Sequence, residues 1–186
     1  PSSSEMLKKA RSRLVLEEIL FLQIALARLR SPKQEQASPV LNKGTALVQK
    51  FISLLPFKLT NAQNRVIQEI FKDMANPCKG MTRLLQGDVG SGKTVVAMAA
   101  IVQAVGSGFQ AAMMAPTEVL AQQHYQSLTT YFRQLGIKVV LLVGNQTKSE
   151  REQILGQIYS GKADVVVGTH ALIQENVVFN SLGLVI

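Results

Sequence analysis

The residues from Gly87 to Thr94, Gly-Asp-Val-Gly-Ser-Gly-Lys-Thr, have the types and the spacing that hold a chain of phosphates. They fit the pattern G-x-x-x-x-G-K-[ST] at every defined position. The glycines permit backbone angles that side chains disfavour, so successive N–H groups can turn toward phosphate oxygens. Lys93 adds an ammonium group, and the Thr94 hydroxyl completes the shell of a Mg²⁺ ion. The sequence therefore predicts a nucleoside-triphosphate site, with catalytic roles for Lys93 and Thr94, formed by Gly87, Asp88, Val89, Gly90, Ser91, Gly92, Lys93 and Thr94.

The segments on either side of this loop support the same interpretation. Arg83–Gln86 is predicted as a short strand that runs into the loop, and Thr94–Val105 as a helix that is apolar on most sides. The N-terminus of such a helix carries a partial positive charge, which favours an anion. A glycine-rich turn can fit the pattern by chance, but a strand before it and a helix after it favour the phosphate site.

Beyond the loop, strands and helices alternate. The pattern predicts strands at residues 109–115, 138–143, 164–167 and 182–186, and helices at 118–134 and 149–159. Upstream, it predicts helices at 46–55 and 61–74, the second capped by Thr60 or Asn61. Continuous apolar strands joined by helices argue for a parallel sheet covered on both faces. The predicted fold class is therefore α/β, preceded by an N-terminal helical segment.

The N-terminal part of the chain has a different character. Residues 4–30 predict one long helix with a wide apolar stripe, which must pack against the following domain or another chain. Residues 31–43 are rich in Pro, Gln, Ser and Asn and predict a linker. We therefore expect an N-terminal helix over 1–32, a linker with a short helix over 33–50, and a nucleotide-binding domain over 51–186.

Charge and composition narrow the class of partner. The chain holds 20 Lys and Arg against 12 Asp and Glu, a formal net charge of +8. Such an excess suits a polyanion such as nucleic acid, although a merely soluble basic surface would look the same. Cys78 is the one cysteine, so the sequence offers no disulfide within the chain and no cysteine cluster for a metal. No signal peptide or membrane-spanning run is seen in the sequence, so we expect a cytoplasmic protein with no membrane partner.

A glutamine ahead of the loop introduces a resemblance to superfamily 2 helicases. In that family, an element upstream of the phosphate loop carries a glutamine whose amide pairs with the edge of adenine, and Gln63 stands at the matching position. An amide donates and accepts at once, as the N6 and N7 atoms of adenine require. The resemblance implies that Gln63 binds the base of ATP. On spacing alone, Gln63 is equally well explained as an exposed polar residue on a helix.

Three later segments resemble the DNA-contacting motifs of the same family. They follow predicted strands and comprise Ala115–His124, Val143–Gln146 and Val165–Leu172. Thr117 is suited to cap the helix that begins at Glu118, and the backbone N–H groups beside it are suited to a phosphate. His170 is assigned through its motif alone. The resemblance implies DNA contacts from Pro116, Thr117, Gly144, Gly168, Thr169 and His170.

Together these strings are very similar to the RecG family of branched-DNA helicases over Phe51–Ile186, and more weakly similar over the preceding helix. The resemblance implies a RecA-like P-loop NTPase fold, ATP and Mg²⁺ as cofactors, and branched DNA as the partner. It also implies a bacterial enzyme of DNA recombination and repair that remodels stalled forks and Holliday junctions. Mfd-type transcription-repair translocases share the loop and the Gly-Thr-His element, so they remain an alternative.

The family also has parts that this sequence does not contain. A strand like Leu184–Ile186 is followed in the family by an Asp-Glu pair that holds Mg²⁺ and positions the attacking water. A second motor domain and a wedge domain complete the family's architecture and would be partners of this chain. We therefore expect a fragment of a longer helicase, truncated before the Asp-Glu pair and inactive in isolation.

Two other classes compete with this interpretation. A GTPase needs an Asn-Lys-x-Asp string to read guanine, and the sequence contains none, while a small-molecule kinase stays open. A nucleic-acid-binding module without enzymatic activity fits the charge, but it has no use for Lys93 and Thr94 at this spacing. Nucleotide binding in the presence of Mg²⁺ distinguishes these hypotheses.

Overall fold

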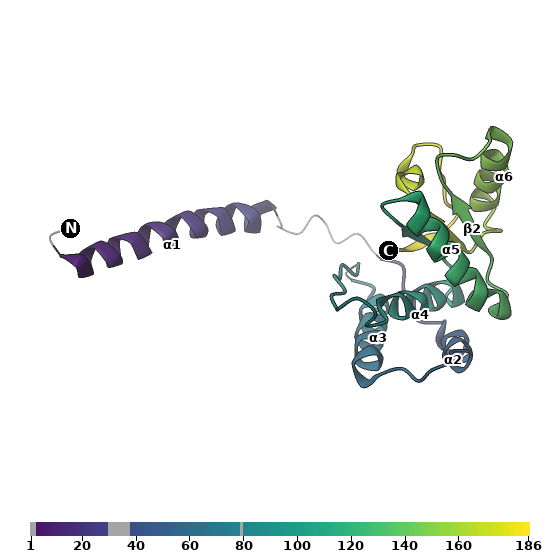
Figure 1. Ribbon diagram of the computed structural model, residues 1–186, viewed down its shortest axis with the longest axis horizontal. Coiled ribbons are helices and arrows are strands. Elements are labelled where there is room, and N and C mark those ends of the chain that lie inside the picture. Colours follow the sequence, from purple (N-terminus) through teal and green to yellow (C-terminus); the bar gives the residue numbers. More distant parts are fainter. Residues whose placement is uncertain (1–2, 30–37, 79) are drawn as a thin grey trace. The chain divides into compact units, whose positions relative to one another are not determined.

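The computed structural model describes residues 3–29, 38–78 and 80–186, and the chain divides into two compact units, Pro1–Gln36 and Ala37–Ile186 (Figure 1). In the first unit, the helix predicted from the apolar periodicity is present as α1 (Ser4–Leu29). Ser3 caps it, since its hydroxyl accepts a hydrogen bond of 3.2 Å from the backbone N–H of Met6. Part of the predicted linker, residues 31–37, lies outside the described residues.

The large apolar side chains of α1 are exposed within their own unit. Leu14 is 65% and Phe21 is 69% exposed, and both belong to the stripe that the sequence analysis expects to be covered. Ion pairs with a four-residue spacing join Lys9 to Glu5 and Arg13 to Glu17 along the same helix. That the stripe packs against a partner stays a prediction.

The second unit is built on a parallel sheet of four strands in the order β2-β3-β1-β4. The strands are β1 (Gln110–Met114), β2 (Val139–Leu142), β3 (Val165–Gly168) and β4 (Leu182–Val185). β3 lies between β1 and β2, so that Met114 and Leu142 are both aligned with Gly168. The predicted parallel α/β fold is confirmed, and the strand ends differ from the predicted ones by no more than the usual fraying.

Helices cover both faces of this sheet (Figure 1). α4 (Lys93–Gly106), α5 (Glu118–Phe132) and α6 (Lys148–Tyr159) pack against its strands, and α2 (Thr45–Ser53) and α3 (Asn61–Met74) pack against α4. Short 3-10 turns lie at Arg133–Leu135 and His170–Ile173. Alternate residues of β3 point to opposite cores: Val165 and Val167 join the cluster under α4 and α5, while Val166 joins a second cluster with Ile158 of α6. This period-two alternation is the packing that a sheet buried on both faces requires.

A buried glutamine ties the start of β1 to the end of α6 and to the segments that lead into β3 and β4. Gln110, which is 5% exposed, donates through Nε2 to the carbonyl oxygens of Ile158 and Ala163, at 3.0 and 2.8 Å. Its Oε1 accepts from the backbone N–H groups of Asn180 and Ser181, at 2.8 and 3.0 Å. The amide thereby makes both of its donor bonds and fills both acceptor positions, which explains how a polar side chain is tolerated in the core.

The prediction of a strand at Arg83–Gln86 is wrong, because these residues form no strand in the structure. A strand needs a neighbour for its backbone groups, and the outer edge of β4 has no strand partner among the described residues. A cavity of about 380 Å³ separates that edge from the coil, with Met81 and Arg83 on one side and Leu184 on the other. Arg83 anchors the coil to α3 instead, through Glu69 (2.9 Å) and Asp73 (2.5 Å).

Among the described residues, no helix combines the length and the apolar character needed to cross a bilayer.

Candidate functional site

The predicted phosphate loop ends at the first turn of α4. Gly90 and Gly92 have φ angles of +80° and +81°, the left-handed region that favours glycine. Gly92 is the N-cap of α4, and its carbonyl oxygen accepts the first backbone hydrogen bond of the helix, from Val95. A Cβ atom added to Gly92 would lie 2.3 Å from Nε2 of Gln63. The dihedral angle at Gly92 therefore favours glycine, and a larger residue there would displace the end of the Gln63 side chain.

Lys93 lies folded over this loop. Its ammonium nitrogen donates to the carbonyl oxygens of Gly87 and Asp88, both at 2.8 Å. The neighbouring Thr94 is half-buried at the start of α4, where the helix presents unpaired N–H groups and its positive dipole end. A cation, a helix N-terminus and a glycine turn thus meet at one place, which is the arrangement that binds phosphate.

The structure brings Gln63 to the same loop. Gln63 is the third residue of α3, and its Oε1 accepts from the backbone N–H of Thr60 (2.9 Å) in a capping box. Its Nε2 donates to the carbonyl oxygen of Ser91 at 3.0 Å. The Thr60 cap is confirmed, and the predicted base-binding residue lies in contact with the loop. One amide hydrogen and one lone pair of Gln63 stay available to a ligand.

Two cavities open beside the loop. The larger, of about 450 Å³, is lined by Gln63, Gly87, Ser91 and Lys93 together with other residues of α3 and α4. Its walls carry the polar groups that phosphates and a base would need.

The second cavity, of about 200 Å³, lies between the α2–α3 connection and α4 and is mostly apolar. It is lined by Phe57, Gly92, Thr94 and Tyr131, among other residues, and Phe57 is 49% exposed. No role is assigned to Phe57 from the sequence. The feature of the sequence that could have indicated one is an aromatic residue in the predicted loop between two helices.

The candidate DNA-binding residues follow the carboxyl ends of three adjacent strands. Thr117 caps α5 as predicted, with its hydroxyl accepting from the backbone N–H of Leu120 at 3.3 Å. Because the strands are parallel, the loops after β1, β2 and β3 lie at one edge of the sheet. The structure thus brings together the exposed residues Pro116, Thr117, Gly144 and His170.

Gly168 and Thr169 are different, because both are buried. A Cβ atom on Gly168 would lie 2.3 Å from the carbonyl oxygen of Leu142, so only glycine fits between the strands there. Thr169 is 2% exposed, and its hydroxyl is enclosed without a hydrogen-bond partner among the described residues. A direct contact between this hydroxyl and DNA therefore requires a change in conformation.

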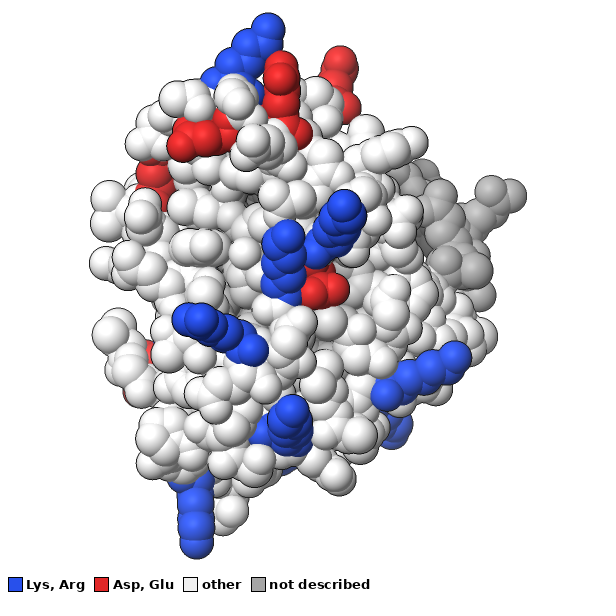
Figure 2. All heavy atoms as spheres, turned by 90° about the vertical axis from the view of Figure 1, so that its right-hand side faces the viewer, with Lys and Arg blue, Asp and Glu red and all other residues white. Residues whose placement is uncertain are grey.

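The charge of the second unit is spread over its surface. On the face shown in Figure 2, two Lys or Arg side chains lie close together near the centre, beside an acidic side chain, and the others are scattered; most acidic side chains gather toward the top. The net charge of +8 therefore favours a polyanion in general without marking its binding place on this face. Among the described residues, no cluster of three or more His, Cys, Asp or Glu is placed to hold a metal. The Thr94 hydroxyl is the oxygen that the loop offers to Mg²⁺.

Comparisons with known proteins agree with this geometry. The model of the DEAD/DEAH box helicase family matches residues 60–186. Over the whole chain, the sequence is 50% identical to the ATP-dependent DNA helicase RecG of Synechocystis sp. (strain ATCC 27184 / PCC 6803 / Kazusa), of which it covers 22%. It is also 50% identical to the RecG helicase of Thermotoga maritima, of which it covers 24%.

The fold comparison gives the same result. A solved structure of RecG bound to a three-way DNA junction superimposes with a TM-score of 0.90 and 49% identity, over 100% of this chain and 25% of that one. The chain thus spans about a quarter of the length of its RecG relatives. The resemblance indicated by the motifs is confirmed, and neither the Mfd-type alternative nor another class of P-loop NTPase is favoured.

Proposed function

Because the chain belongs to the DEAD/DEAH box helicase family, we propose that it forms the ATP-binding part of the first motor domain of a RecG-type DNA helicase. The observation that carries the proposal is the meeting of Gly92, Lys93 and Gln63 at one helix N-terminus. The activity of the whole protein is part of the proposal: remodelling of stalled forks and Holliday junctions in the bacterial cytoplasm, with ATP hydrolysis as the source of energy. So are its partners, which are branched DNA, a second motor domain and a wedge domain.

Phosphate binding requires Lys93 to exchange partners. The ammonium group now bonded to Gly87 and Asp88 would turn to the β- and γ-phosphates, and the loop N–H groups would take the remaining oxygens. Mg²⁺, when bound, neutralises charge on the transferred phosphoryl group. The Thr94 hydroxyl, at the start of α4, would supply one of its ligands.

The base would be recognised by Gln63 and Phe57. The free amide hydrogen and lone pair of Gln63 suit N7 and N6 of adenine, whereas guanine presents two acceptors at the same edge. The half-exposed ring of Phe57 offers a face on which a purine can stack, next to Gly92 and Thr94. The amide of Gln63 thereby favours ATP over GTP, whereas stacking on Phe57 suits either purine.

DNA would bind along the carboxyl edge of the sheet. Backbone N–H groups at the start of α5 and in the loop after β2 would contact phosphates without reading sequence, which suits an enzyme that selects DNA by its shape. The N–H of Gly144 is an exception, because it donates to Glu118. The residues assigned to this edge are Pro116, Thr117, Gly144, Gly168, Thr169 and His170, with the two buried ones acting through the backbone that they shape.

The test is ATP hydrolysis by the full-length protein with linear duplex, single-stranded and three-way junction DNA. We expect the junction to stimulate hydrolysis most, and GTP to be a much poorer substrate than ATP. Hydrolysis that no DNA stimulates, at saturating ATP and Mg²⁺, would point to another P-loop enzyme. DNA binding without any nucleotide turnover would point to a simple binding module.

A further inference from the structure

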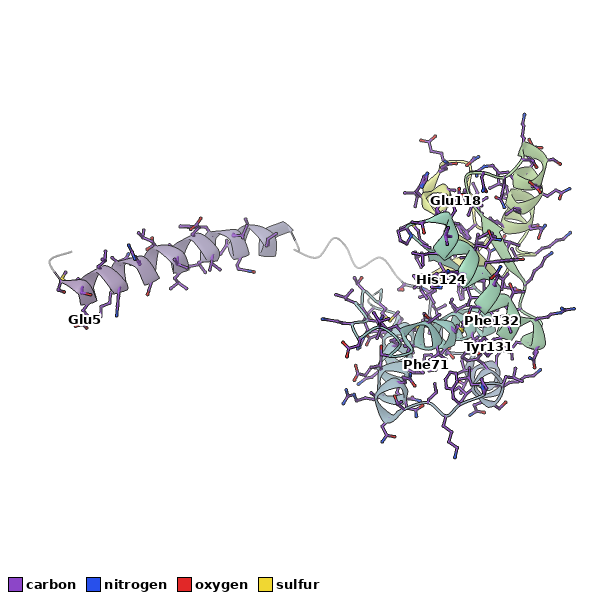
Figure 3. All side chains as sticks on the ribbon, in the orientation of Figure 1. Glu5, Phe71, Glu118, His124, Tyr131 and Phe132 are labelled. Atoms are coloured by element: carbon purple, nitrogen blue, oxygen red, sulfur yellow. The ribbon has the colours of Figure 1, made fainter. Side chains whose placement is uncertain are left out.

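A carboxylate joins two of the loops at the carboxyl edge of the sheet. Oε1 of Glu118 accepts a hydrogen bond of 3.0 Å from the backbone N–H of Gly144. Glu118 is the first residue of α5 and directly follows Thr117, whereas Gly144 lies just beyond the end of β2. Figure 3 shows Glu118 at the opposite end of α5 from Tyr131 and Phe132.

The bond connects strands that are not neighbours. β1, which leads into α5, is separated from β2 by β3, and α5 packs against both β2 and β3. The Glu118 side chain therefore reaches across the end of β3, where Gly168 and Thr169 leave the sheet. The contact thus links the segments that follow β1 and β2 across the end of β3.

The Gly144 end of the contact is itself held in place. The side chain of Gln146 folds back on the same turn: Oε1 accepts from the N–H of Val143 at 3.1 Å, and Nε2 donates to the carbonyl oxygen of Leu141 at 2.9 Å. A Cβ atom on Gly144 would lie 3.1 Å from Oε1 of Glu118. The turn is thus fitted closely to the carboxylate.

A negative charge at an edge that binds a polyanion needs an explanation. An unengaged carboxylate would repel DNA phosphates. The dipole of α5 and a backbone N–H both stabilise the charge of Glu118, and its side chain is half-buried. The carboxylate of Glu118 is therefore engaged by a hydrogen bond within the protein, which reduces its repulsion of a DNA phosphate.

We propose that Glu118 is a positioning residue, which sets the spacing between the DNA-contacting segments Pro116–Thr117 and Gly144 without touching DNA itself. The inference rests on the proposed function, because it assumes that these segments contact DNA. Two contact points held at a fixed spacing bind successive phosphates with less loss of conformational freedom than two independent loops. Loss of the contact should therefore weaken DNA binding and leave the chemistry of ATP unchanged.

The test compares Glu118→Ala, Glu118→Gln and the control Glu152→Ala in the full-length protein. Glu152 is an exposed acid on α6. The measured quantities are the half-saturating concentration of junction DNA for ATP hydrolysis, kcat at saturating DNA, and KM for ATP. We expect Glu118→Ala to raise the half-saturating DNA concentration roughly tenfold, with kcat and the KM for ATP nearly unchanged. Glu118→Gln, whose amide oxygen still accepts from Gly144, should restore most of the affinity, and Glu152→Ala should behave as wild type.

A second variant keeps the proposal testable if Glu118→Ala does not fold. Gly144→Ala retains the N–H but crowds Oε1 of Glu118, so it should weaken DNA binding in the same way. Combined with Glu118→Ala, it should add little further loss, since both changes disrupt one contact.

The outcomes separate the inference from the proposed function. Unchanged DNA affinity in Glu118→Ala, with a wild-type protein that junction DNA does stimulate, would overturn the inference alone. Equal effects of Glu118→Ala and Glu118→Gln would also overturn it, since charge rather than the hydrogen bond would then matter. A wild-type protein that DNA does not stimulate would instead reject the proposed function.

Discussion

The side-chain amide of Gln63 donates a hydrogen bond of 3.0 Å to the carbonyl oxygen of Ser91, so the residue expected to read the base is bonded to the loop expected to hold the phosphates. The same amide closes the capping box of α3 through Thr60. Binding of a base at Gln63 and the conformation of the loop are therefore physically connected. Substitution of Gln63 should therefore change both base recognition and the conformation of the loop.

Lys93→Ala should abolish ATP hydrolysis and weaken ATP binding. The change removes the ammonium group that the proposal assigns to the phosphates, together with its bonds to Gly87 and Asp88. The measurement is hydrolysis and equilibrium binding of a fluorescent ATP analogue. Lys50→Ala, on the exposed surface of α2, is the control and should hydrolyse ATP normally. Full activity of Lys93→Ala would show that Lys93 does not bind the phosphates of ATP.

Gln63→Glu should raise the KM for ATP by roughly tenfold and reduce the preference for ATP over GTP. A glutamate keeps an oxygen for the N–H of Thr60 but loses the donor to Ser91 and to the base. Gln63→Ala also breaks the capping box, so a lower melting temperature is expected for that variant but not for Gln63→Glu. If the KM for ATP is equal in Gln63→Glu and wild type, Gln63 does not bind the base.

Gly92→Ala should weaken nucleotide binding, because its Cβ atom would displace the end of the Gln63 side chain and break the bond from Nε2 to Ser91. Gly108→Ala is the matched control: its φ angle is +87°, but no atom lies within 4 Å of the added Cβ. The control should cost about 1 kcal/mol of stability from backbone strain and leave nucleotide binding intact. Similar nucleotide binding by both variants would show that the close approach at Gly92 has no functional role.

Gln110→Leu should lower the free energy of unfolding by about 3 kcal/mol, since it removes all four hydrogen bonds of the buried amide. The carbonyl oxygen of Ile158 keeps a second bond, from the N–H of Gly161. Gln103→Leu is a useful comparison: among the described residues, that buried amide makes one hydrogen bond, to the carbonyl oxygen of Leu41, and its own Oε1 is unpaired. Denaturant unfolding should show a smaller loss for Gln103→Leu. The reverse order would mean that the Gln110 network is not important for stability.

Stability should fall in acid partly through Glu150. Hydrogen bonds from the side chain and the backbone N–H of Thr147 hold the pKa of Glu150 below its usual range. A carboxyl whose pKa is lowered on folding contributes stability above its unfolded-state pKa, and that contribution is lost as the pH falls through the lower folded-state pKa. Thermal melting between pH 7 and pH 3 should therefore depend less on pH in Glu150→Gln. An unchanged pH dependence would assign the effect to other carboxyls.

Local patterns predicted most of the fold. α3 was found with its bounds and cap because its apolar periodicity and the Thr60 cap are features of adjacent residues. The strand at Arg83–Gln86 was predicted wrongly, since a strand is defined by a neighbour that residues 83–86 do not specify.

The candidate site likewise contains residues that a local motif predicts and residues whose position depends on the fold. The loop glycines follow from a motif, whereas the burial of Thr169 depends on how α5 and β3 pack, which no short segment of sequence contains. Phe57 was missed for a related reason: only the fold places it beside Gly92.

The outer edge of β4 has a practical consequence. Among the described residues no strand pairs with it, and Val185 of this strand is 64% exposed. Such an edge is a template for strands of other molecules, so preparations of these 186 residues alone should self-associate at high concentration. Val185→Lys would oppose this pairing between the β4 edges of two copies and should keep the polypeptide monomeric for biophysical work.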